Sequence, residues 1–157
     1  MQRRAVLRSL TAVTAAAATG LAGCNGDGGD GADHQCATPN GDLRNALPRG
    51  NGFTDPSVDA NDNATEVGGA TEHVLGSYIT DDQNYLFVIA KYESNDAAKT
   101  AAATDENWAG FGYPVTGYIV VGKFAYVAMG PDEATVTDLM ATAAPLDEDC
   151  ATTIVFL

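Results

Sequence analysis

The order of strand-like and helix-like hydrophobic patterns between residues 73 and 157 constrains the fold of this chain more than any other feature of its sequence. Stretches rich in β-branched and aromatic residues, bounded by turn residues, predict strands. These stretches are 73–80, 85–92, 118–121, 124–129 and 151–157. The polar residues 81–84 form the turn between the first two strands, and Gly122 and Lys123 form a tight hairpin between the third and fourth.

Two helices are predicted between these strands. The first is capped by Ser94 or Asn95 and extends to about residue 107, with a stripe of small alanines that allows close approach to a sheet. The second begins near Pro131 and ends at Pro145. Its apolar residues follow the spacing i, i+3, i+4 and i+7 of a core-facing helix, at Val136, Leu139, Met140 and Ala143.

From residue 85 the order is strand, helix, strand, strand, helix, strand, which is typical of a ferredoxin-like α+β fold. We therefore expect a ferredoxin-like or variant two-layer sandwich: an antiparallel sheet with both helices on one face, plus the extra N-terminal strand 73–80. With a two-residue turn, Val121 faces Phe124 and Ile119 faces Tyr126 on one side of the sheet, and apolar residues also occupy the other side. The second apolar face must be covered either by residues 37–72 or by another subunit.

Residues 37–72 show no periodicity and predict an irregular lid segment beside a core formed by 73–157. Its expected apolar anchors are Leu43, Leu47, Phe53, Val58 and Val67. Asp59, Asn61 and Asn63 match the first ligand positions of an EF-hand loop. Alanines stand where the glycine and the clamping glutamate are required, so only a weak surface cation site remains as an alternative. Asn63 also begins an Asn-Ala-Thr glycosylation sequon.

The first 24 residues contain two motifs in succession. Arg3 and Arg4 precede an apolar stretch that is too short and too rich in Thr for a transmembrane helix. This start resembles a twin-arginine export signal, and Leu21-Ala22-Gly23-Cys24 resembles the lipobox of exported lipoproteins. The resemblance implies that residues 1–23 are a signal peptide and that a lipid on Cys24 anchors the protein at the extracytoplasmic face of the cell membrane. A disordered or amphipathic start of a cytosolic protein is the alternative.

Beyond position 23 the chain is strongly acidic. Three of the 8 basic residues lie in the first 23 positions, and the other 5 stand against all 21 acidic residues, a formal charge of −16. This charge disfavours nucleic acid as a partner, and concentrated salt would screen its internal repulsion. Together with the signal, the chain resembles a haloarchaeal exported lipoprotein; an ordinary acidic secreted protein is the alternative. Residues 24–35, rich in Gly and Asp, predict a flexible tether rather than a calcium loop, and 36–157 form a single domain.

Cys36 and Cys150 are the two cysteines that remain once Cys24 carries a lipid. Because the resemblance places the domain outside the cytoplasm, we expect them to form a disulfide that fastens the start of the domain to its end. A metal-binding or redox-active pair is the alternative, although only His34 lies near Cys36 in the sequence.

The sequence contains no motif typical of a nucleophile, a zinc site or a phosphate-binding loop, so no catalytic residue, metal or cofactor is predicted. Trp108, Phe111 and Tyr113 follow the first helix, where they either pack over the core or contact a ligand or partner. We therefore expect a membrane-anchored lipoprotein that binds a protein partner or a small ligand without catalysis. An accessory or structural subunit of a cell-surface assembly, including a homodimer, is the alternative, and an enzyme is a third.

Overall fold

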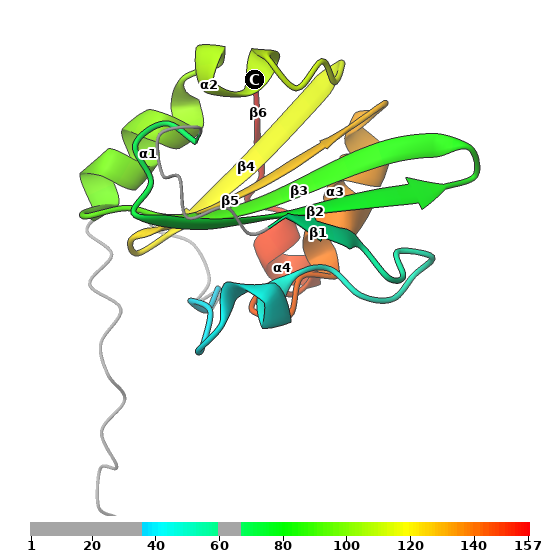
Figure 1. The fold of residues 1–157 in the computed structure, drawn as a ribbon, viewed down its shortest axis with the longest axis horizontal. Helices are drawn as coiled ribbons and strands as arrows, with labels where there is room; N and C mark the ends of the chain where they lie inside the picture. Colours follow the sequence, from blue (N-terminus) through cyan, green and yellow to red (C-terminus); the bar gives the residue numbers. More distant parts are fainter. Residues whose placement is uncertain (1–35, 60–66) are drawn as a thin grey trace, which may run out of the picture.

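A computed structural model describes residues 36–59 and 67–157 of the chain (Figure 1). The predicted export signal at Arg3 and Arg4, the lipid site Cys24, the tether and the sequon at Asn63 lie outside these residues. The strands are β1 (Ser57–Asp59), β2 (Glu72–Thr80), β3 (Gln83–Lys91), β4 (Val115–Val121), β5 (Phe124–Gly130) and β6 (Val155–Phe156). The helices are the 3-10 helix η1 (Leu43–Ala46), α1 (Asn95–Ala103), α2 (Glu106–Ala109), α3 (Glu133–Ala141) and α4 (Glu148–Ala151). Across both ranges, no helix combines the length and apolar character needed to cross a membrane.

The six strands form one antiparallel sheet in the order β1-β2-β3-β5-β4-β6. β2 and β3 pair from end to end, with Glu72 opposite Lys91 and Thr80 opposite Gln83. In the β4–β5 hairpin Ile119 lies opposite Tyr126, the register that a two-residue turn predicts. The α+β class, the antiparallel sheet and the additional N-terminal strand, which is β2, are therefore confirmed.

The strand order differs from the ferredoxin-like one. There the first strand of the unit lies between two others of the same unit, whereas here β2 flanks β3 on one side and β6 joins β4 at the far edge. Helix α1 connects β3 to β4, and helix α3 connects β5 to β6. Both connections cross the sheet in the same direction, but their first strands, β3 and β5, are antiparallel. Right-handed crossovers then place their helices on opposite faces. The expectation that both helices lie on one face of the sheet is therefore wrong, because α1 packs on one face and α3 on the other.

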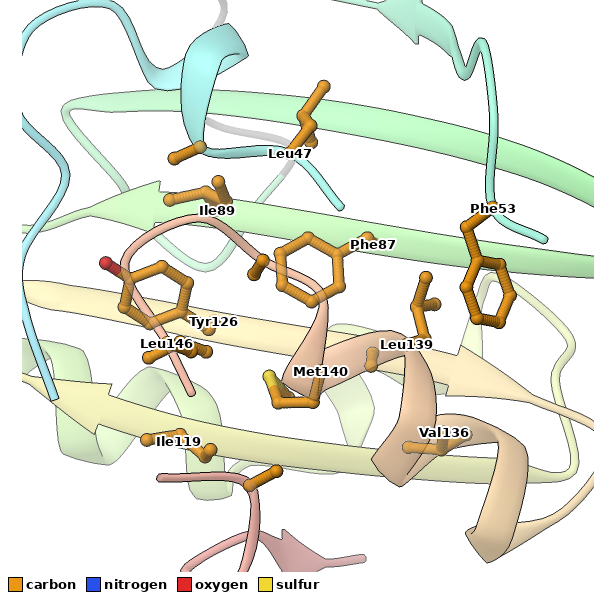
Figure 2. Packing of buried hydrophobic residues seen from close by; sticks show 14 of the residues in the cluster. Leu47, Phe53, Phe87, Ile89, Ile119, Tyr126, Val136, Leu139, Met140 and Leu146 are labelled. Carbon is orange, nitrogen blue, oxygen red and sulfur yellow. The ribbon is translucent and has the colours of Figure 1, made fainter. Parts of the chain in front are cut away.

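Each face of the sheet has its own hydrophobic cluster. On the face we call the α3 face, Phe87 and Tyr126 pack against Leu139 and Met140 of α3, together with residues of η1 and α4 (Figure 2). On the opposite α1 face, Val88 and Val127 pack against the alanines of α1 and the indole of Trp108. Helices α1 and α2 lie on one side of the sheet in Figure 1, and α3 and α4 lie on the other. The small alanines that the sequence placed on the first helix therefore do face the sheet.

The segment before β2 covers part of the α3 face. Leu43, Leu47 and Phe53 are buried, and the Phe53 ring packs edge-on against both Tyr78 and Tyr85. Val58 is different, because it lies on the edge strand β1 and keeps 37% of its surface exposed. The chain thus supplies the intrachain lid that the sequence predicted, with α1 covering the other face.

Two predicted elements end earlier than expected. The first helix stops at Ala103, because Thr104 is extended, and a separate turn of helix, α2, follows. The strand predicted over 151–157 is confined to Val155–Phe156. The residues before it form α4, whose start is capped by the Asp147 carboxylate, which accepts a hydrogen bond from the backbone N–H of Cys150.

Candidate functional site

Cys36 and Cys150 form the predicted disulfide, with their Cα atoms 5.5 Å apart. Two hydrogen bonds hold the same end of the domain: the Ala37 N–H donates to the Pro145 carbonyl, and the Tyr126 hydroxyl donates to the Ala37 carbonyl, each at 3.0 Å. Cys36, which directly follows the predicted tether, is therefore held against α4 by its disulfide to Cys150.

The aromatic loop after α1 is mainly part of the core. Trp108 is 1% exposed, and its indole N–H donates to the Ala102 carbonyl at 3.0 Å. Phe111 and Tyr113 pack against the same cluster but stay partly exposed, and burial raises the pKa of the Tyr113 phenol. Of the three aromatics predicted as a contact site, only Phe111 and Tyr113 present surface to a ligand.

A hollow lies on the α1 face, between α1 and the edge strand β6. This groove has a volume of about 490 Å³ and is lined by Lys99, Ala103, Tyr118, Ile119, Val120, Thr153 and Val155. Strand β4 supplies its floor, α1 supplies one wall, and the C-terminal segment supplies the other. The sequence did not predict this groove.

The groove exists because the C-terminal strand is short. Tyr118 lies opposite Val155, and Leu157 donates its N–H to the Thr116 carbonyl, so β6 covers the first half of the β4 edge. Val120 lies further along β4, beyond the last residue paired with β6. Helix α1 covers the sheet further from this edge. On this face of β4 Thr116 is buried, Tyr118 and Val120 stay half-buried, and Val155 of β6 is 48% exposed.

The electrostatics of the groove depend on one cation. Ion pairs in the described parts of the chain join Arg44 to Asp42 and Lys91 to Glu72, both on exposed side chains. Neither pair involves Lys99, which lies in the α1 wall of the groove. The groove thus combines aliphatic surface, one aromatic ring and one ammonium group, which is an arrangement suited to binding.

A second hollow, of about 290 Å³, lies beside the disulfide between the N-terminal segment and the residues after α3. Its lining includes Asn40, Asn45 and Pro145 and no charged side chain. Among residues 36–59 and 67–157, no three His, Cys, Asp or Glu residues come together in a way that could hold a metal ion. His73 is buried in β2, and it lines neither hollow.

Comparison with known proteins adds no relative: no family model matches the chain, and no curated protein or solved structure is significantly similar to it.

Proposed function

We propose that this protein is an exported lipoprotein of haloarchaeal type, anchored through a lipid on Cys24 at the extracytoplasmic face of the membrane, and that its domain binds a ligand or partner without catalysis. The twin-arginine pair Arg3-Arg4 and the lipobox ending at Cys24 support the export and the anchor. The disulfide between Cys36 and Cys150 is consistent with an oxidising compartment.

The groove between α1 and β6 is the observation that supports a binding role. Its volume of about 490 Å³ is large enough for a small molecule, in a hollow that stays open to solvent. An exposed valine, a half-buried tyrosine and a lysine that forms no ion pair with any residue of 36–59 or 67–157 lie together there, in a chain rich in carboxylates. Phe111 and Tyr113 pack against the same cluster as Tyr118 but do not line the groove.

The alternative, a structural subunit of a surface assembly, rested on an apolar sheet face that required an outside cover. Phe87 and Tyr126 on one face and Val88 and Val127 on the other are all 0% exposed within the single chain. That observation therefore no longer favours an assembly subunit over a binding protein.

Native mass spectrometry of the full-length protein, extracted gently from its own membranes at high salt, tests the binding role. We expect non-covalent mass beyond the Cys24 lipid, and we expect Val155→Asp to abolish it, because a charge would stand in the groove wall. Val58→Asp is the matched control, since Val58 is 37% exposed on β1, at the opposite edge of the sheet. A bare protein, or a bound species that survives Val155→Asp, would contradict the proposal.

A further inference from the structure

We infer that the groove between α1 and β6 takes a small amphipathic molecule with a single carboxylate, whose apolar part lies over β4 and whose anionic end meets Lys99. This inference rests on the proposed binding function and specifies the chemical class of the ligand. The occupant is a small molecule rather than a peptide strand, because Thr153 of the C-terminal segment lines the hollow together with Val120 and leaves little free β4 edge for an added strand.

The apolar part of the site comes from three elements. Tyr118 and Val120 alternate with Ile119 along β4, so their side chains share the α1 face. Val155 lies opposite Tyr118 and continues this surface across to β6, and Ala103 adds a methyl group from α1. An alkyl group would find aliphatic side chains from three elements there, together with one aromatic ring.

The charge of the ligand follows from the one cation in the lining. Lys99 is the only charged residue there, and it makes no ion pair in the described residues. The chain carries a formal net charge of −13, so most of its surface repels anions, and a lone ammonium beside an apolar floor is where one negative charge is tolerated. A monoanion balances that ammonium, whereas a doubly charged phosphate would leave excess negative charge.

The remaining polar groups agree with a small anionic head. The Thr153 hydroxyl donates to the Cys150 carbonyl at 2.7 Å and is therefore not available as a donor to a ligand. Tyr118 contributes a phenol O–H, which is a suitable second donor to a carboxylate. The capping residue Ser94, at the N-terminus of α1, does not line the groove, so the helix dipole is not directed at the ligand.

Binding of three probes that share an unbranched chain of eight carbons, the carboxylate carbon of octanoate included, tests this inference: octanoate, 1-octanol and octyltrimethylammonium. The full-length chain carrying Cys24→Ala, so that no lipid of its own competes, is titrated by calorimetry and by the shifts of the Tyr118 ring signals. The salt concentration is the same for every probe and is the lowest at which the chain stays folded, because salt screens the proposed ion pair. Lys99→Gln removes the proposed charge partner, and Lys123→Gln removes an equal charge from the exposed β4–β5 turn.

We expect octanoate to bind more tightly than octanol and the ammonium probe to bind least. Because the Lys99 side chain is exposed, Lys99→Gln should weaken octanoate by about two- to fivefold, with octanol unchanged, and Lys123→Gln should have no effect. Equal losses in both lysine variants, or octanol binding as tightly as octanoate, would overturn the carboxylate. If Val155→Asp still removed all binding in that case, the groove would remain the binding site. Native mass spectra that show only a bound protein or a second copy of the chain, with no binding of octanoate, would also overturn the inference. If native mass spectrometry found no bound species and the titrations found no bound probe, the proposed function would be refuted as well.

Discussion

Loss of the Cys36–Cys150 disulfide should lower the free energy of unfolding by several kcal/mol. The bridge joins residues 114 positions apart, and loop-closure entropy for a ring of that size corresponds to about 5 kcal/mol at 25 °C. In the folded state the same end of the chain is also held by the hydrogen bonds from Ala37 to Pro145 and from Tyr126 to Ala37. We therefore expect the native fold to persist without the bridge and most of the loss to arise in the unfolded chain.

The assay is urea unfolding at constant high salt, comparing the wild type with the double variant Cys36→Ala/Cys150→Ala. Trp108, the one tryptophan of the chain, is 1% exposed and reports global unfolding by fluorescence. Cys24→Ala is the control, because it changes a cysteine that takes no part in the bridge. A loss below about 1 kcal/mol with an unchanged denaturant slope would refute the loop-entropy argument.

Trp108→Phe should lower the free energy of unfolding by about 2–3 kcal/mol, because it shrinks a core side chain and leaves the Ala102 carbonyl without its indole donor. Urea unfolding followed by circular dichroism measures this loss. An unchanged free energy of unfolding would contradict the core assignment of this residue. Burial raises the pKa of Tyr92 to about 12, so the neutral phenol is favoured in the folded state. The contribution of Tyr92 to stability should be constant below about pH 10 and should fall as the pH rises from there toward 12. Over that range Tyr92→Phe should reduce the slope of stability against pH by about 1.4 kcal/mol per pH unit; an identical slope in the variant would count against this reasoning. Asp82→Gly should stabilise the β2–β3 turn by about 0.5 kcal/mol, because Asp82 has a φ of 62°, a conformation that glycine adopts at lower cost; a lower melting temperature would be the contrary result.

The parts of the fold set by local pattern could be predicted from the sequence. The β4–β5 register follows from a two-residue turn at Gly122 and Lys123, and the alternation of buried side chains on both faces follows from it. The core face of α3, with Val136, Leu139 and Met140 all buried, follows from helical spacing. The pairing of Cys36 with Cys150 followed from the cysteine count once an exported context was assumed.

The strand order could not be predicted, because it depends on which edge the C-terminal segment joins. Gly117 is one determinant: a Cβ at this position would come within 2.6 Å of the Ile154 Cδ1 atom, so glycine lets the C-terminal segment close on β4. That contact is long-range and leaves no periodic signal. The groove has the same origin, since Lys99 from α1, Tyr118 from β4 and Val155 from β6 meet only after β6 has taken this edge.

Intact-mass spectrometry of the protein purified from the membranes of its own cells tests the central proposal most directly. The proposal predicts a chain of residues 24–157 with a covalent lipid on Cys24, two hydrogens lighter than the fully reduced form because Cys36 and Cys150 are oxidised. A chain that keeps residues 1–23, or one recovered without lipid from the cytosol, would contradict the assignment of an exported, lipid-anchored binding protein.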